Sequence, residues 1–472
     1  MKREHDVEQE ALFGTLPVQG KERLYGFLDA FLVLSGYCIA TWSYTQGAYL
    51  ATLVGFRQLL IGAFLGAVFM LLIYQLPVIL SARWGIDIWV WLRAVFGPRG
   101  VKVMTVVIIL INFPWYAVCA ELFASSMGNL AGLFGLRISH GEHILLALLC
   151  VGLGSLIALR GPGAITWTTR LLVPLLLLVG CVVVFVGASS VPAEVLWSYR
   201  PTDPPYGGGV IAYIISVEAN FAFVITLVGG MAEVPRLTRT EPAALWSGVL
   251  GQGLSGSFFV VVGAVMAIAM EYVTGQVTED PTLMLATLTV PAVALLSLLL
   301  VAFANVGTQA VGSYIYAVML RASFRLAGYR TLLAVLAGYV TLLCLWGKVT
   351  EYFGSFLTIG ACVYAPLAAL LFTDFFFVRK QRLDLRSAYG MEGHRAYDYT
   401  GGFNWVGLFC VAAGIAISLV AYDPVNATVR CLPLFSLTPT GASFLGTGLL
   451  YYLFSRIPAT RRYLLRDREV RP

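Results

Sequence analysis

The chain has 472 residues, of which 59% are hydrophobic and only 12% are charged. Soluble globular proteins carry about 25% charged residues, so this composition excludes a soluble domain and indicates a polytopic membrane protein. The net charge of +6 does not by itself indicate a nucleic-acid partner, because Lys and Arg gather in the loops on one side of a membrane in such proteins.

Twelve hydrophobic runs predict twelve transmembrane helices, because each is close to the ~20 residues needed to cross ~30 Å of hydrocarbon. Residues 1–24 are polar and mixed in charge, so we expect the first helix to act as its own insertion signal. The predicted spans are at about 25–53, 57–80, 101–128, 142–159, 164–188, 208–234, 242–270, 287–320, 331–347, 352–378, 403–421 and 437–455.

The basic residues are distributed unevenly over the predicted loops. With the N-terminus placed inside, 26 of the 31 Lys and Arg residues fall on the cytoplasmic side. This bias follows the positive-inside rule and predicts a protein of the cell (inner) membrane with both termini cytoplasmic. The loop 379–402 and the basic tail 458–472 are then cytoplasmic, and topology and anionic-lipid contact explain the tail better than a nucleic-acid-binding role does.

Two predicted helices are irregular at mid-membrane depth. The first contains Ser35, Gly36 and Gln46-Gly47, and the sixth contains Asn220 and Gly229-Gly230. Glycines and polar residues at that depth allow a helix to unwind where its backbone lines a cavity. Because these helices are five apart, they predict two inverted five-helix repeats, at about 25–188 and 208–378, in a ten-helix core of residues 25–378. Residues 403–457 then add two further helices.

The predicted eighth helix, Thr287 to Leu320, carries polar side chains that an apolar helix does not need. Asn305, Gln309 and Ser313 share one stripe at four-residue spacing, and Thr308 lies on the neighbouring one. One reading is hydrogen bonding and close packing between helices. The other is a solute or cation site at mid-membrane depth.

Two acidic residues and one Pro-Trp pair also stand out. Glu121 and Glu218 lie in or near hydrocarbon, where carboxylates are costly and often functional, so either could carry a proton during transport. The alternative is that Glu121 pairs with a polar neighbour and Glu218 lies near the outer interface. Pro114 next to Trp115 favours a kink and a cavity in the third helix.

Three motifs at the cytoplasmic ends of helices 2, 6 and 10 point to a known family. They are Ala82–Gly85 with Arg93–Gly100; Ala232-Glu233 with Arg236; and Thr373–Phe375, Val378–Lys380, Tyr397–Tyr399 and Gly402–Trp405. Together they resemble the nucleobase:cation symporter-1 family of purine, cytosine, uracil, allantoin and hydantoin permeases, over about residues 22–455. The resemblance implies the LeuT-type inverted-repeat fold with broken helices 1 and 6.

The resemblance also implies a cation site between the first and eighth helices. Gly36 and Ile39 match the family's backbone ligands, and Ala304 and Thr308 match its helix 8 ligands. Gly307 stands where the family has a hydroxyl ligand, so the choice between Na⁺ and H⁺ as coupling ion stays open. No other cofactor is implied.

For the substrate, the resemblance implies that Trp115 stacks on a planar ring. Cys119 stands where some members have an amide. On helix 6 the matching ring-stacking position falls on Val224, and a shift of one residue would instead place Phe223 in the pocket.

Gln309 and Ser313 occupy positions where the family has hydrogen-bonding asparagines. A flat heterocycle needs such groups for its edge, together with an aromatic face. The sequence therefore predicts a monomeric secondary transporter, and no enzyme, that imports a small planar heterocycle by cation symport in the lipid bilayer. The alternative is an amino-acid or amine transporter of the same fold.

Overall fold

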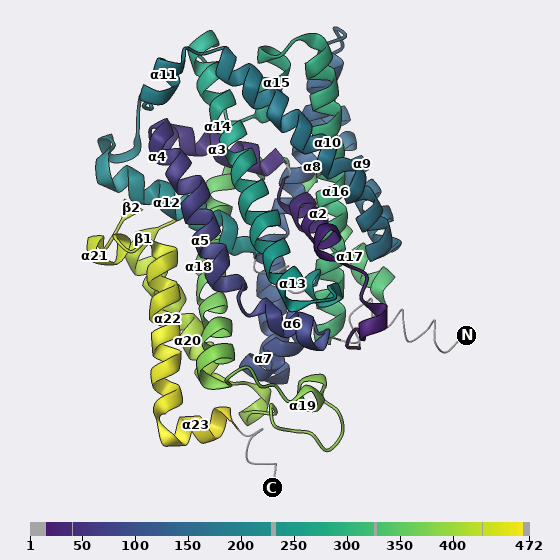
Figure 1. The fold of residues 1–472 in the computed structure, drawn as a ribbon, viewed down its shortest axis with the longest axis vertical. Coiled ribbons are helices and arrows are strands. Elements are labelled where there is room, and N and C mark those ends of the chain that lie inside the picture. The colour runs from purple at the N-terminus through teal and green to yellow at the C-terminus, as the bar shows by residue number, and fades with distance from the viewer. Residues whose placement is uncertain (1–15, 40, 228–232, 325–327, 427, 466–472) are drawn as a thin grey trace.

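The structure is a computed structural model that describes residues 16–39, 41–227, 233–324, 328–426 and 428–465. Within these ranges, nine helices or continuous helical runs are long and apolar enough to cross a membrane, and a bent pair at the start makes a tenth. Helices α12 (Gly209–Ile225) and α22 (Pro439–Arg456) complete the twelve predicted spans (Figure 1).

The first five spans follow the short turn η1 (Gly20–Glu22) and are built from nine helices and one π-helical segment, η2. In chain order they are α2 (Phe27–Cys38) with α3 (Thr41–Leu53); α4 (Phe56–Ile61), η2 (Gly62–Gly66), α5 (Ala67–Gln75) and α6 (Val78–Trp84); α7 (Ile88–Asn112) with α8 (Pro114–Gly132); α9 (His140–Leu159); and α10 (Pro162–Ser189).

The next five spans follow a loop that contains α11 (Ala193–Ser198) and η3 (Pro205–Gly207). They are α12 with η5 (Pro235–Leu237); α13 (Glu241–Gly248), η6 (Val249–Leu254) and α14 (Ser255–Thr274), followed by the loop helix α15 (Pro281–Leu288); α16 (Pro291–Phe324); α17 (Tyr329–Trp346); and η7 (Thr350–Tyr352), α18 (Phe353–Thr373) and η8 (Asp374–Val378).

The last two spans, α20 and α22, pack against α18. Between them a two-stranded antiparallel hairpin pairs Tyr422 with Val429. The elements of this region are α19 (Leu385–Tyr389), η9 (Thr400–Gly402), α20 (Trp405–Ala421), β1 (Tyr422–Asp423), β2 (Thr428–Val429), α21 (Leu432–Phe435), α22 and α23 (Pro458–Leu464).

The core spans form two packed groups. In one, α2 and α3 lie against α13, η6 and α14, and α12 lies against α5; in the other, α8, α9, α16 and α17 pack together. Helices α3 and α14 approach backbone to backbone, since a Cβ on Gly47 would overlap the Val260 carbonyl and one on Gly263 would overlap the Tyr44 backbone. Helix α10 contacts α2, α14 and α16, and so joins the two groups.

Two of the predicted spans are interrupted. The first is two helices bent by 56°, with α2 ending at Cys38 and α3 beginning at Thr41. In the third, α7 ends at Asn112 and α8 begins at Pro114, because proline cannot donate the backbone hydrogen bond that would continue the helix. The break predicted at Gly229-Gly230 of the sixth span lies outside the described residues.

One buried guanidinium ties the tenth span to three other parts of the chain. Arg379 donates to Asp374 at 3.0 Å and to the Ala94 carbonyl of α7 at 3.1 Å. It also donates to the Tyr399 hydroxyl at 3.0 Å and to the Leu464 carbonyl of α23 at 2.9 Å. Because a buried charge is stable only when it is paired, these contacts fix how the four segments meet.

Candidate functional site

The break in the first span leaves the Cys38 carbonyl without its helical partner. Two side chains just past the break replace that partner: the Trp42 indole N–H donates to this oxygen at 2.8 Å, and the Ser43 hydroxyl at 2.6 Å. The Cys38 carbonyl is therefore satisfied inside the protein, as a backbone polar group must be where water is absent.

Helix α16 holds both sides of this break. The Thr308 hydroxyl donates to the Gly36 carbonyl of α2 at 3.1 Å, and the Asn305 side-chain amide donates to the Thr41 hydroxyl of α3 at 2.5 Å. We call these two contacts, together with the bonds to the Cys38 carbonyl, the polar junction. Thr308 thus bonds to the first span and not to its own helix.

The four residues predicted to bind a cation meet at this junction only in part. Gly36 and Thr308 are in direct contact, and Ile39, just after α2, and Ala304 of α16 are both buried. Gly307 brings no side-chain oxygen, although a Cβ built there would meet only the Leu172 side chain, at 3.6 Å. Position 307 therefore has room for a side chain, and the hydroxyl is missing only because this residue is glycine.

An aromatic cluster surrounds Trp115 in the first turn of α8. Its ring centroid lies 5.5 Å from Trp42, 6.4 Å from Phe223 and 5.2 Å from Phe353, and all three contacts are edge-to-face. These rings come from spans 1, 6 and 10. The Trp115 indole N–H is buried and has no hydrogen-bond partner among the described residues.

On α12, Phe223 packs against Trp115, whereas Val224 makes other contacts. The Val224 carbonyl accepts a hydrogen bond from the Tyr74 hydroxyl at 2.5 Å, and its side chain is buried. Phe223 thus contacts Trp115, and which of the two residues stacks on a substrate stays a prediction.

Gln309, Ser313 and Cys119 are all buried. None of them carries a ring, so none is a member of the aromatic cluster. The Cβ and Cγ of Gln309 pack on Gly154 of α9. Both polar atoms of its amide lack a hydrogen-bond partner within the described part of the chain. Such a buried amide costs free energy until a ligand or water supplies its bonds.

Two contacts at this site were missed from the sequence. Trp42 lies between Gly36 and Gln46 in the first span, and no role was predicted for it. Phe353 begins α18 and contacts Trp115 from 238 positions further along the chain, so no local pattern could have revealed it. Similarly, Asn305 was predicted as a polar group of helix 8 without a partner, which the structure supplies in Thr41.

Comparison with known proteins identifies the family. A family model described as a permease for cytosine/purines, uracil, thiamine and allantoin matches residues 17–437. The chain belongs to this permease family. This confirms the resemblance drawn from the three motifs and agrees with the prediction of a transporter rather than an enzyme.

Two curated relatives match parts of the permease. The hydantoin permease of Microbacterium maritypicum is 31% identical over 94 residues, which are 20% of this chain and 19% of that protein. The purine-uracil permease NCS1 of Arabidopsis thaliana is 22% identical over 372 residues, which are 73% of this chain and 60% of that protein. The chain therefore spans less than two thirds of the length of either relative.

Solved structures share the fold of the permease. Mhp1, a nucleobase-cation-symport-1 family transporter, in a closed conformation with bromovinylhydantoin bound, gives a TM-score of 0.76 at 18% identity over 96% of both chains. A Na⁺-coupled sialic acid symporter gives 0.64 at 12% identity over 91% of this chain and 90% of that one. These likenesses confirm the predicted all-α, LeuT-type inverted-repeat fold.

The two carboxylates of the permease that sequence singled out are each held by one threonine. Glu121 of α8 accepts from the backbone N–H and the hydroxyl of Thr350, just before α18. Glu218 of α12 accepts from the backbone N–H of Thr440 at 2.9 Å and from its hydroxyl at 2.7 Å, at the start of α22. Glu121 thus pairs with a polar neighbour, which was the alternative to a role in proton transfer.

Proposed function

We propose that this permease imports a nucleobase or a related small planar nitrogen heterocycle by cation symport, with alternating access to a site between spans 1, 3, 6 and 8. The observation that carries the proposal is the aromatic cluster. Trp115 brings an aromatic ring and an unpaired indole N–H to the middle of the bundle, beside the break in the first span. A planar heterocycle needs an aromatic face and a few polar groups of this kind.

In this proposal Trp115 and Phe223 stack on the heterocycle, and Val224 and Cys119 complete the apolar wall. The unpaired amide of Gln309 and the hydroxyl of Ser313 bind its polar edge. An amide offers one acceptor and two donors, which suits a ring that carries both carbonyl and N–H groups.

We place the coupling cation at the polar junction, bound by the backbone oxygens of Gly36, Ile39 and Ala304 and by the hydroxyl of Thr308. A cation there ties α2 to α16 and favours the outward-open state, so it raises substrate affinity by linkage. Its loss inside the cell would release both ligands. Na⁺ is the coupling ion that we propose for this oxygen-lined site. H⁺ is the alternative, because Gly307 brings no hydroxyl ligand for Na⁺.

We also propose that the permease is a monomer of the inner membrane with both termini cytoplasmic, and that residues 25–378 form its transport core. The loop elements α19 and α23 lie at the same end of the molecule as α7, opposite α11 and α15 (Figure 1). That end carries Arg93, Arg379 and Arg461, which supports its placement on the cytoplasmic side.

Thermal unfolding of the purified permease tests the proposal. We expect one of a set of nucleobases, hydantoins, allantoin and thiamine-type pyrimidines to raise the unfolding temperature, and Na⁺ to enlarge that shift. A shift that responds to pH and not to Na⁺ would assign the coupling to protons. A shift with amino acids or amines, and with none of the heterocycles, would refute the proposed substrate class.

A further inference from the structure

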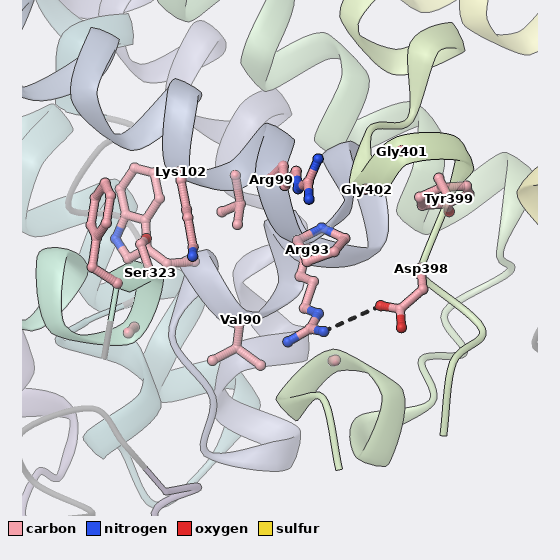
Figure 2. A pocket seen from close by; sticks show the side chains of 15 residues that line it. Val90, Arg93, Arg99, Lys102, Ser323, Asp398, Tyr399, Gly401 and Gly402 are labelled. Atoms are coloured by element: carbon pink, nitrogen blue, oxygen red, sulfur yellow. Dashed lines mark hydrogen bonds and ion pairs between the residues drawn. The ribbon is translucent and has the colours of Figure 1, made fainter. Parts of the chain in front are cut away.

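A cavity of about 550 Å³ lies outside the candidate transport site, at the α7–α19 end of the bundle. Its walls come from α7, from the last turn of α16 and from residues 398–402 before α20. Three cationic side chains line it: Arg93, Arg99 and Lys102. Figure 2 shows Lys102 on the Ser323 side of this cavity, and Arg93 and Arg99 on the side nearer to Asp398.

The positive charge of this cavity is only partly balanced. Arg93 pairs with Asp398, the one carboxylate in the lining, at 3.3 Å (Figure 2). Arg99 and Lys102 are exposed, and neither pairs with a carboxylate among the described residues. The aliphatic part of the Arg99 side chain lies against Gly402, whose φ of +81° favours glycine. The ammonium group of Lys102 lies 6.0 Å from the centre of the Phe324 ring.

An apolar strip begins next to these two cations. Val103, Val106 and Leu110 follow Lys102 on α7 at helical spacing, and they are 50%, 44% and 56% exposed. They lead from the cavity along α7 toward Pro114, which lies near the middle of the third predicted span, about 101–128. A basic pocket matches an anionic head, and the apolar strip that continues from it matches an acyl chain. Together they fit an amphiphile better than a free anion, because a free anion would make no contact with the strip.

We propose that this cavity binds an anionic phospholipid of the cytoplasmic leaflet. Arg99 and Lys102 hold its phosphate group, and one acyl chain lies along Val103, Val106 and Leu110. Guanidinium and ammonium groups are the usual partners of phosphate, and the cavity is large enough for a glycerophosphate headgroup. The assignment to the cytoplasmic leaflet rests on the proposed orientation of the permease.

The bound lipid would join parts of the molecule that belong to different units. Arg99 and Lys102 are on α7, Ser323 and Phe324 end α16, and Gly401 and Gly402 precede α20. A ligand that contacts all three binds the folded state and not the unfolded chain, so it raises the unfolding temperature, and the rise grows with the logarithm of its affinity.

The test compares the unfolding temperature of the full chain in nanodiscs of phosphatidylcholine, without transport substrate, with and without phosphatidylglycerol. The double variant Arg99→Gln/Lys102→Gln removes the two unpaired charges. A matched control, Arg461→Gln/Arg462→Gln, removes two exposed charges from α23 at the same end. The variant Arg99→Lys/Lys102→Arg changes the same two positions but keeps both charges. It therefore separates loss of charge from a folding defect caused by substitution at these positions.

We expect phosphatidylglycerol to stabilise the wild-type chain, the control and the charge-conserving variant, and its apparent affinity to fall about tenfold or more in the double Gln variant. An equal response in the double Gln variant would overturn the proposal, because the effect would then be general surface charge. An equal response to inorganic phosphate would also overturn it and assign the cavity to a free anion. Since no heterocycle is present, failure of the proposed transport function would leave this result intact.

Discussion

The polar junction and the aromatic cluster lie side by side but are held together by different forces. The junction consists of directed hydrogen bonds, two of them from α16 to opposite sides of the break in the first span. The cluster consists of four rings in edge-to-face contact, which depend on contact area more than on single atoms. Trp42 belongs to both, because its N–H completes the junction while its ring packs on Trp115.

This difference has a consequence for the two proposed ligands. Cation binding at the junction should respond to the loss of a single oxygen atom. Substrate binding at the cluster should respond to the loss of a whole ring and tolerate exchange of one ring for another. Four substitutions separate these behaviours.

The largest effect is expected from Trp115→Ala. Stacking of a base on an aromatic side chain contributes about 1–3 kcal/mol, so heterocycle affinity should fall roughly 5- to 150-fold. Trp115→Phe should retain most of the affinity. Binding is measured by the ligand-induced shift in unfolding temperature. The control is Trp167→Ala, which changes a tryptophan that is 71% exposed. Unchanged affinity in Trp115→Ala would remove the cluster from the substrate site.

A second, smaller effect is expected from Thr308→Val, which keeps the shape of the side chain and removes its hydroxyl. The cation should bind roughly 2- to 12-fold more weakly, since one polar contact typically contributes about 0.5–1.5 kcal/mol net. Substrate affinity measured without the cation should stay the same. The matched control is Thr358→Val, whose hydroxyl bonds only to the Gly354 carbonyl of its own helix. If both variants lose cation response equally, Thr308 is not a ligand.

Trp42→Phe tests the residue that the two regions share. It keeps a ring beside Trp115 but removes the N–H that bonds to the Cys38 carbonyl, a contact that contributes about 1 kcal/mol. We expect the cation and the substrate each to bind with only a modest loss, and the enhancement of one by the other to fall several-fold. Calorimetric titration of each ligand in the presence and absence of the other measures this enhancement. Full retention would show that the coupling runs elsewhere.

The smallest effect is expected from Gly307→Ser, which adds the hydroxyl that the family motif contains. Only Leu172 lies near the new Cβ, at 3.6 Å, so the helix should tolerate the change. If Na⁺ is the coupling ion, its affinity should rise a few-fold in the variant. If H⁺ is the coupling ion, neither the wild-type chain nor the variant should respond to Na⁺. Gly307→Ala controls for the added carbon.

The spans were predictable from the sequence because each depends on a continuous apolar run, and the first break because Gly36 and its polar neighbours are adjacent in the chain. The partners across the site were not. Asn305 meets Thr41 across 264 positions, and Phe353 reaches Trp115 from another repeat. The choice between Phe223 and Val224 depended on how α12 is turned, which the hydrophobic pattern could not specify because both side chains are apolar and buried.

The Arg379 guanidinium also bears on how the chain is made. Its charge enters the membrane boundary with the tenth span, but one of its acceptors, the Leu464 carbonyl, lies 85 residues further along the chain. During synthesis this arginine must therefore wait for both remaining spans and for α23 before its hydrogen bonds are complete. Helix α23 thus completes the buried hydrogen bonds of an earlier span, and a chain cut short before α23 would keep the Arg379–Asp374 ion pair but lack the acceptor at Leu464.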